Sequence, residues 1–551
     1  MAVEPKITDR LSEPQTAAER WPRQIKFIVG NEACERFSYY GMVGILAGYI
    51  SGQVDKGGLG QDADMATQIV HLFKFANYFM PLFGAWLSDK IIGRYHTILW
   101  VSLFYCAGHG VLASSDLAGG VHGKMICLVV GLALIAFGSG GIKPCVSAFV
   151  GDQFRPDQAH LLQQAYGAFY WSINFGSFFS FLVVPWVKNH HGYSLAFAVP
   201  GVLMAIATFI FWLGTKHYVR VPPGRETKRP GFLPVFFAAY SRRSGLGVAP
   251  LLNLLTSLGL PLIAMVAMTL LALARQMTPL VRFIGWAGLI CVGVWYVLIV
   301  VSSLLGRLEL PDGFWSAARH RYKDDEIAAA RSVSPILFVF ALIPIFWALF
   351  DQTNSTWILQ GNKMVPFTVF GLTIEAEQMQ SANPALVMIL VPLLTLGLYP
   401  RLGKLATPLK RMSLGMFITA ASYVIVALLQ KQVESGAQIS VAWQTLPYLV
   451  LTTAEVLVST TGLEFSFTQA APEMKSTIMS FWLLTVAFGN LLVTAITKVL
   501  TRPEAGGEAH AGSVSTGRFF LYAGLTFIVA ILFSIIAMRY RYRPGTVREG
   551  V

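Results

Sequence analysis

Charged residues are scarce in this sequence. Asp, Glu, Lys and Arg make up only 13% of the 551 residues, about half the usual share in soluble globular chains. Hydrophobic residues make up 54%, and the mean hydropathy is +0.57. A chain of this size cannot bury so much apolar surface in a water-facing fold. The composition therefore excludes a soluble protein and predicts an all-α membrane protein with many spanning helices.

Cysteine is also scarce, and its spacing fits no metal site. The five cysteines all lie in or beside apolar runs: Cys34, Cys106, Cys127, Cys145 and Cys291. An odd, scattered set of this kind is not a disulfide framework. Residues 1–26 lack the n-region and h-region of a cleaved signal peptide. We therefore expect the first apolar run to remain as a helix, with the N-terminus inside.

Bases outnumber acids, and the formal net charge is +13. Many bases gather in the polar segment before residue 247: Lys216, Arg220, Arg225, Lys228, Arg229, Arg242 and Arg243. A nucleic-acid groove would interleave bases with aromatic residues on one soluble face. Bases in short loops between apolar runs instead follow the positive-inside rule for membrane proteins. We therefore expect lipid around this chain and no nucleic-acid partner.

Fourteen apolar runs are long enough to cross a bilayer as helices. They divide into six, two and six, and lie near 26–51, 68–88, 96–115, 123–150, 165–186, 193–216, 247–274, 279–305, 333–358, 379–400, 410–430, 441–470, 476–500 and 517–540. With both termini inside, inward segments hold about 29 Lys and Arg and outward segments about 10. The predicted organisation is a cytoplasmic segment at 1–25, a six-helix bundle at 26–216, a linker with two additional helices at 217–332, a second six-helix bundle at 333–541 and a cytoplasmic tail at 542–551.

Two six-helix halves joined by a basic linker resemble the parallel-repeat layout of major facilitator transporters, which bind substrate near the bilayer midplane. The loop after the second run, GAWLSDKIIGR at residues 84–94, is similar to the G-x-L-x-D-x-x-G-R loop of that superfamily. Its Asp89 can meet a helix N-terminus, and its Arg94 can bridge to a neighbouring helix. We expect Asp89 and Arg94 to latch one conformation.

Ionisable side chains within apolar helices are costly and mark functional groups. The first helix holds Glu32, Glu35 and Arg36, whose spacing places them on one helical face. Lys143 lies in GSGGIKP, where small residues let helices approach closely. A lone buried ammonium tends to lose its proton, so we expect a carboxylate partner for Lys143.

The second half contributes acids: Asp351, Glu455 and Glu464. One interpretation is that these charges are static clamps between helices. The other is proton coupling, which requires acids and bases in both halves of a carrier. A carboxylate near a movable base can load a proton in one conformation and release it in the other.

Several motifs resemble those of the proton-dependent oligopeptide transporter family. The two extra helices between the halves resemble its bacterial branch. EACERFSYYG at 32–41 is similar to E-x-x-E-R-F-x-Y-Y-G, and FYWSINFGS at 169–177 is similar to F-Y-x-x-I-N-x-G-S. The Lys143-Pro144 pair, FWALFDQ at 346–352 and Glu455 also match. The resemblance implies a symporter that imports di- and tripeptides by alternating access. It implies a cell-membrane protein that is driven by the proton gradient, needs no cofactor and works as a monomer.

The resemblance also implies roles for individual residues. Proton coupling falls to Glu32, Glu35, Arg36, Lys143, Asp351 and Glu455. Lys143 and Tyr40 face the peptide carboxylate with Asn174 nearby, while Glu455 takes the amine with Asn383 and with Ser459 one turn below. The side-chain pockets are walled by Tyr78, Tyr170, Trp347 and Trp482. From residue type alone, these aromatic residues could equally be interface anchors or packing, and Asn174 could be interhelical glue.

The sequence departs from the family at three positions. Val43 replaces an arginine that contributes to the peptide site and pairs with the seventh-helix acid. Thr460 replaces a proline after Ser459, which makes a helix kink less certain, and Glu464 is an additional acid. We therefore predict that Asp351 lacks a base and is protonated over more of the working pH range. The alternative is that another base, such as Lys74, or a set of hydrogen bonds stands in for the arginine.

Three alternative functions remain open. The same fold carries other small solutes, such as amino acids, nitrate or other anions. A membrane enzyme would need a nucleophile–base set or metal ligands in its longest loops, at 217–246 and 306–332, and neither contains a ligand spacing such as H-E-x-x-H. A channel would not need the symmetric division into halves. We expect a carrier and no enzyme.

Overall fold

The computed structural model describes most of both predicted halves. The described residues are 21–154, 158–224, 230–241, 312–369, 371–402, 407–471, 474–500 and 514–542. The two additional helices predicted at 247–274 and 279–305 lie outside the described residues, as do residues 1–20 and 543–551. The bounds predicted for the linker and the two tails therefore stay predictions.

The N-terminal half consists of helices that follow the predicted runs. They are α1 (Ile25–Ser51), α2 (Ala63–Phe79), α3 (Pro81–Leu87), α4 (Arg94–Ala113), α5 (Gly120–Asp152) and α6 (Ala159–Leu213). The 55 residues of α6 would extend about 80 Å as one helix, far more than the ~30 Å bilayer core. The backbone breaks at Gly192, where φ is 82°, a conformation that favours glycine. Thus α6 contains both the fifth and the sixth predicted spans.

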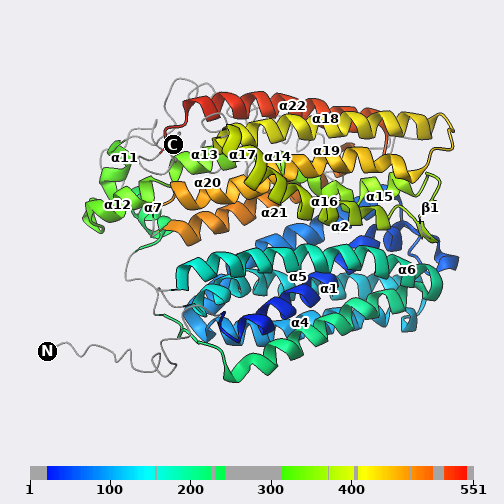
Figure 1. Ribbon diagram of the computed structural model, residues 1–551, viewed down its shortest axis with the longest axis horizontal. Coiled ribbons are helices and arrows are strands. Elements are labelled where there is room, and N and C mark those ends of the chain that lie inside the picture. Colours follow the sequence, from blue (N-terminus) through cyan, green and yellow to red (C-terminus); the bar gives the residue numbers. More distant parts are fainter. Residues whose placement is uncertain are drawn as a thin grey trace, which may run out of the picture.

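The linker and the C-terminal half are divided into more and shorter helices than the N-terminal half. Described linker helices are α7 (Phe232–Ser241), α11 (Asp312–Ser316) and α12 (Asp324–Arg331). The C-terminal half contains α13 (Ser334–Phe340), α14 (Pro344–Phe350), α15 (Thr356–Gly361), α16 (Ala382–Pro392), α17 (Tyr399–Leu402), α18 (Pro408–Glu434), α19 (Thr445–Glu455), α20 (Thr461–Gln469), α21 (Lys475–Leu500) and α22 (Thr516–Arg539). A short antiparallel hairpin of β1 (Phe367–Val369) and β2 (Leu372–Ile374) pairs Phe367 with Ile374. Figure 1 shows the two halves as two layers of long helices.

The described helices confirm a polytopic membrane protein. Eight of them are long and apolar enough to cross a membrane, or nine if the bent pair at 324–354 counts as one span. The predicted first and second spans correspond to α1 and to α2 with α3, and both carry charged residues that lower their hydropathy. The predicted total of fourteen spans stays a prediction.

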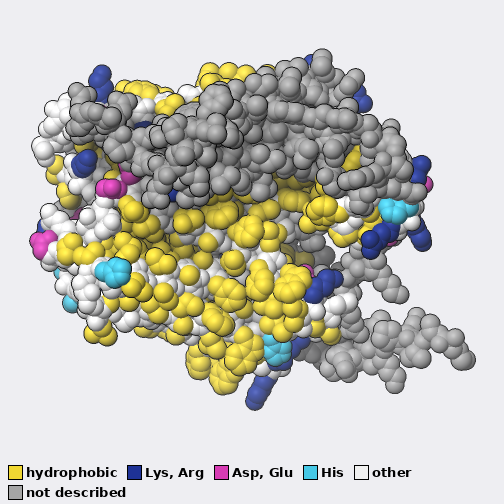
Figure 2. All heavy atoms as spheres, turned by 180° about the vertical axis from the view of Figure 1, so that it is seen from behind, with side chains coloured by type: hydrophobic (Ala, Val, Ile, Leu, Met, Phe, Trp, Pro, Cys, Tyr) yellow, Lys and Arg dark blue, Asp and Glu magenta, His cyan; other side chains and the backbone are white. Residues whose placement is uncertain are grey.

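The outer surface is suited to lipid. Figure 2 shows hydrophobic side chains over the middle of one face, with bases toward the ends. Large apolar side chains from several helices are about half exposed, including Trp86, Trp100, Phe104, Trp212 and Ile528. So broad an apolar exposure is not found on soluble monomers, and hydrocarbon satisfies it.

The two ends of the bundle can be told apart by the chain direction. We call the end at which α1 begins and α22 finishes the terminal face, and the opposite end, with the β1–β2 hairpin, the distal face (Figure 1). The positive-inside prediction would make the terminal face cytoplasmic. Within the described residues, the halves are joined by three ion pairs: Arg518–Asp64 and Lys188–Glu377 near the distal face, and Lys74–Asp351 closer to the middle of the spanning helices.

Close backbone packing adds to the distal contacts. The Gln380 side chain donates a hydrogen bond to the Gly44 carbonyl of α1 at 3.1 Å. A Cβ atom at Gly44 would lie 2.9 Å from the Phe181 ring, so a larger residue would push the helices apart. The halves are therefore held together toward the distal face.

Candidate functional site

The first-helix charges form one buried cluster on α1. The Arg36 Nε lies 2.6 Å from Glu32 Oε1 and 3.0 Å from Glu35 Oε2. Both glutamates are 1% exposed, and the Ser139 hydroxyl of α5 donates to Glu35 Oε1 at 3.3 Å. The predicted common face is confirmed. One base shared by two acids leaves the cluster with one carboxylate more than it can neutralise, and this composition suits a proton-binding group.

Lys143 does not have the carboxylate partner that the sequence predicted. Its Nζ lies 4.3 Å from the ring centroids of both Tyr39 and Tyr78. It makes no hydrogen bond within the described residues, although the atom is buried. That prediction is wrong because Arg36 occupies both glutamates, so the ammonium rests between two aromatic faces instead. Such a cation can still meet a negative group that arrives from outside.

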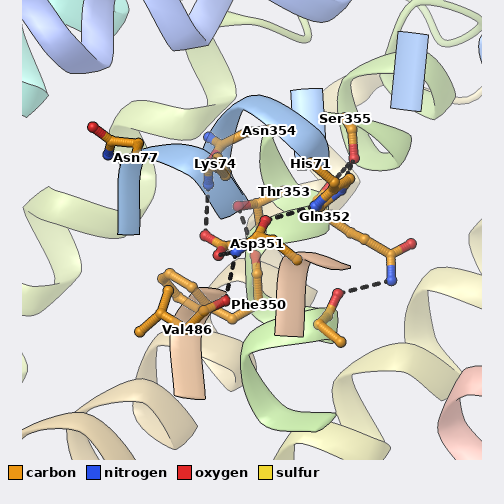
Figure 3. A network of polar contacts seen from close by, with 12 residues as sticks. His71, Lys74, Asn77, Phe350, Asp351, Gln352, Thr353, Asn354, Ser355 and Val486 are labelled. Atoms are coloured by element: carbon orange, nitrogen blue, oxygen red, sulfur yellow. Dashed lines mark hydrogen bonds and ion pairs between the residues drawn. The ribbon is translucent and has the colours of Figure 1, made fainter. Parts of the chain in front are cut away.

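Asp351 has a base, and the base is Lys74 of α2. Lys74 Nζ lies 2.5 Å from Asp351 Oδ1 and also bonds the Asn354 side chain. Asn490 of α21 donates to the other carboxylate oxygen at 2.6 Å. Figure 3 shows Lys74 directed at Asp351 from across the interface. The expectation of an unpaired Asp351 is therefore wrong: Val43 removes a base from α1, and α2 supplies one.

His71 is a member of this network that the sequence reasoning missed. Its Nδ1 lies 2.7 Å from Asn490 Oδ1 and its Nε2 lies 2.8 Å from the Ser355 hydroxyl. Residue 71 is fully buried and makes both contacts with the other half (Figure 3). The available signal was its spacing, since His71 precedes Lys74 by three residues and so shares a helical face with it.

Glu455 lies where its helix changes geometry. It ends α19, and a π-helical segment at Val456–Thr460 follows at once. Segments of this type are frequent at functional sites. The helix therefore departs from α geometry even though Thr460 replaces the proline of relatives.

Glu455 has an amide partner and no base. The Asn383 side chain donates to Glu455 Oε2 at 2.6 Å and to the Thr452 hydroxyl at 3.1 Å. No base pairs with Glu455 in the part of the chain that the structure describes. The sequence grouped Asn383 with Glu455, and the structure brings them into direct contact.

Tyrosines of the N-terminal half face these acids. Tyr40 is within electrostatic reach of Arg36 on its own helix and of Glu455 across the interface. Tyr170 is also within electrostatic reach of Glu455, and its side chain is 38% exposed. Tyr39 is 1% exposed and turns the other way, toward Lys143. The two adjacent tyrosines thus have different surroundings, and a substrate-facing role for Tyr40 stays a prediction.

The predicted tryptophans lie together in the C-terminal half. Trp347 and Trp482 are 8% and 3% exposed, with ring centroids 6.2 Å apart in an edge-to-face arrangement. A Cβ atom at Gly462 would collide with the Trp482 ring, so this glycine makes room for the indole. The pair forms a buried aromatic surface from α14 and α21.

Other predicted residues are placed less directly. The Asn174 amide donates to the Tyr170 carbonyl of its own helix at 3.0 Å, and Ser459 is half-buried in the π-helical segment. Glu464 pairs with Arg411 of α18 at 2.7 Å and is 48% exposed at its side chain. The additional acid is thus part of an ion pair within the C-terminal half, apart from the Glu455 contacts.

Arg94, which was predicted to act with Asp89 as a conformational latch, bridges to a neighbouring helix. Arg94 at the start of α4 holds the Asp152 carboxylate at the end of α5 at 2.8 and 3.0 Å. Asp89 lies 3.5 Å from Arg94 in a π-helical segment that ends at Gly93, where φ is 80°. The loop ties α2–α3, α4 and α5 together at the terminal face.

Two helical halves with buried acids, bases and aromatic residues at their interface define a membrane transporter. The chain belongs to the POT family, whose profile matches residues 95–511. It is similar to a crystal structure of an auto-inhibited POT family peptide transporter, with 37% identity, a TM-score of 0.77 and coverage of 96% of this chain and 100% of that one. It is similarly close to the POT family transporter PepTSo, with 40% identity, a TM-score of 0.77 and coverage of 94% and 98%.

A relative among characterised proteins is solute carrier family 15 member 2 of Rattus norvegicus, 31% identical over 84% of this chain. The chain spans about half the length of that relative, with 56% of it covered. The family, the helical transporter fold and the membrane location are thereby established. Membership in a transporter family also sets aside the membrane-enzyme alternative.

Proposed function

We propose that this chain is a proton-coupled symporter that imports di- and tripeptides by alternating access. The proposal rests on Glu455, a half-buried acid of the C-terminal half that has an amide partner and no base within the described residues. The N-terminal half offers the opposite charge in Lys143, whose ammonium also has no counter-ion there. A zwitterionic peptide carries an amine for the first group and a carboxylate for the second. Charge-assisted hydrogen bonds of this type are the strong ones.

The aromatic residues support a substrate with variable side chains. Tyr170 is exposed enough to be reached, and Trp347 and Trp482 present large apolar faces. Such faces accept many shapes because the hydrophobic effect is non-directional. The fixed ends of a peptide would then provide orientation, while its side chains would need only apolar contact.

The distal ion pairs support alternating access. They join the halves at Lys74–Asp351, Arg518–Asp64 and Lys188–Glu377, so opening at the distal face requires these pairs to separate. Proton binding to Asp351 would remove the charge that holds Lys74, which links protons to opening. Under the positive-inside prediction the protein described here is closed to the outside, in an inner membrane with both termini in the cytoplasm. It works without a cofactor and as a monomer in this proposal.

Uptake by proteoliposomes tests the proposal. Labelled dialanine should accumulate against its concentration gradient when an inward proton gradient is imposed, and an uncoupler should abolish the accumulation. Unlabelled tripeptide should compete, while single amino acids and nitrate should not. Competition by nitrate with none by peptide would contradict the proposal and favour the small-anion carrier.

A further inference from the structure

Behind the Glu32–Glu35–Arg36 cluster lies a second set of buried polar side chains that the proposed cycle does not use. We call it the histidine branch, and it consists of Ser38, Tyr105, His109 and Ser139. All four residues are at most 1% exposed. The Ser38 hydroxyl lies 2.9 Å from His109 Nε2, and the Ser139 hydroxyl donates to Glu35 at 3.3 Å. The branch therefore begins at a carboxylate of the predicted proton-coupling group and ends at an imidazole.

Helical spacing brings the members of the branch onto facing sides of their helices. Glu35 and Ser38 are three residues apart on α1, and Tyr105 and His109 are four apart on α4, so each pair shares a face. The Tyr105 and His109 rings stack with centroids 5.2 Å apart. Three helices thus place hydroxyl groups between the carboxylate and the imidazole.

The branch has more hydrogen-bonding capacity than it uses. His109 Nδ1 and the Tyr105 hydroxyl have no hydrogen-bond partner within the described residues, although both are buried. Side chains that only join helices are normally satisfied when buried. A neutral imidazole has one donor and one acceptor nitrogen and becomes a double donor on taking up a proton. Spare capacity at this position is what a proton-holding group requires.

The surroundings of His109 limit where a proton can come from. Ser38 of α1 and Tyr105 of α4 face the ring, while Gly201 of α6 packs on its base, since a Cβ there would lie 3.0 Å from His109 Cβ. The charged groups beyond these contacts are Glu35 and, through it, Arg36 and Glu32. Glu35 is therefore the acid that shares a face of α1 with Ser38, the hydrogen-bond partner of His109.

We propose that His109 is a proton-holding residue of the transporter, connected to Glu35 through the hydroxyl groups of the branch. This inference rests on the proposed proton symport. A proton leaves the protonated Glu35 carboxyl, each intervening hydroxyl accepts one proton and gives up another, and an N–H bond forms at His109 Nε2. A neutral acid and a neutral imidazole become a carboxylate and an imidazolium, so the net charge of the bundle does not change. The transfer lets Glu35 become ionised without releasing the proton to either side of the membrane.

The test compares two measurements in proteoliposomes: gradient-driven dialanine uptake and dialanine counterflow, which needs no net proton movement. His109→Gln keeps a side chain able to hydrogen-bond Ser38 but cannot hold the proton. We expect its driven uptake to fall by about tenfold or more, as for loss of a positioned proton-transfer group, with counterflow close to that of wild type. The dependence of driven uptake on pH should also lose one transition.

Two further variants separate this role from a structural one. Ser38→Ala leaves the imidazole in place and removes its connection, so it should reproduce the selective loss even if His109→Gln folds poorly. Ser102→Ala removes another buried hydroxyl of α4, bonded to the Ile98 carbonyl of its own helix, and should leave both measurements unchanged. The inference would be overturned if His109→Gln and Ser38→Ala lost uptake and counterflow equally. It would also be overturned if neither variant lost driven uptake. A wild type that shows no gradient dependence would instead overturn the proposed function, and this inference with it.

Discussion

Two lysines of the N-terminal half have buried ammonium groups with opposite surroundings. Lys74 is 2.5 Å from the Asp351 carboxylate and also bonds Asn354, so its charge is matched across the interface. Lys143 rests between the rings of Tyr39 and Tyr78 with no counter-ion in the described part of the chain. The first arrangement stabilises contact between the halves. The second keeps a cation available for a partner that is not part of the protein.

The acids of the C-terminal half show the same contrast. Asp351 is held by Lys74 and by Asn490, whereas Glu455 is held by the neutral amide of Asn383. Groups matched by an opposite charge thus join the halves, whereas Lys143 and Glu455 have no opposite charge within the described residues. We interpret the matched set as a gate and the unmatched set as the substrate site, and the predictions below test that division.

The largest effect is expected for Lys143→Ala. Removing the unmatched cation should reduce gradient-driven dialanine uptake by about a hundredfold or more, the scale of losing a group that handles a proton. Counterflow should survive in part, because the two halves can still alternate between their conformations and exchange peptide across the membrane. Lys124→Ala, which removes a base paired with Asp116 near the distal end of α5, is the matched control. Driven uptake at the wild-type rate in Lys143→Ala would show that the lysine is only structural.

The next largest effect is expected for Asp351→Asn. It leaves Lys74 buried without its charge partner, which typically costs about 3–5 kcal/mol, and both thermal stability in detergent and driven uptake should fall. The double variant Lys74→Met with Asp351→Asn should recover stability, since neither charge remains, but not driven uptake. If Asp351→Asn alone kept its stability, the ion pair would not be holding the halves together.

The outer pair Lys188–Glu377 should have a smaller effect. Replacing both residues with glutamine removes a partly buried charge-assisted bond worth about 1 kcal/mol, or about fivefold in the population open at the distal face. Spin labels at Val54, in the short helical turn after α1, and at Val369 of β1 are both exposed at the distal face on different halves. They would report a longer distance in a cysteine-free background. An unchanged distance distribution would place this pair outside the gate.

The smallest effect is expected for Asp116, which lies outside the spanning helices. Its hydrogen bond with Lys124 lowers the pKa of this carboxyl below its usual range. The resulting stability is present near neutral pH and is lost as the pH falls through that lowered pKa. Because the side chain is half exposed, Asp116→Asn should cost no more than about 1 kcal/mol. Thermal unfolding at neutral and acidic pH would measure it, and a larger loss at acidic pH would have the wrong sign.

The fold could be predicted from the sequence because bilayer thickness fixes the length of an apolar run. The long runs at 96–115, 123–150 and 410–430 correspond closely to α4, α5 and α18. The breaks within spans could not be predicted in the same way. The π-helical segment after Glu455 has no proline to mark it, whereas Pro344 begins α14 at the bend after α13.

The residue types of the candidate site could be predicted from the sequence. The contacts that each charged residue makes were harder to predict. Spacing placed Glu32, Glu35 and Arg36 together, since all three share one helix. The partners of Lys143 and Asp351 depend on how separate helices meet, which a single sequence does not reveal. A rule that every buried charge has an opposite charge nearby succeeds for Asp351 and fails for Lys143, where aromatic faces take the place of an acid.

The central claim is that the unmatched Glu455 receives the amine of a peptide. The most direct measurement is inhibition of labelled dialanine uptake by free and by N-acetylated dialanine, in wild type and in Glu455→Gln. The account predicts a strong preference for the free amine in wild type, since losing one partner of a buried charge pair typically costs about 2–5 kcal/mol. It predicts that the two competitors become nearly equal in Glu455→Gln. An undiminished preference for the free amine in the variant would contradict the assignment.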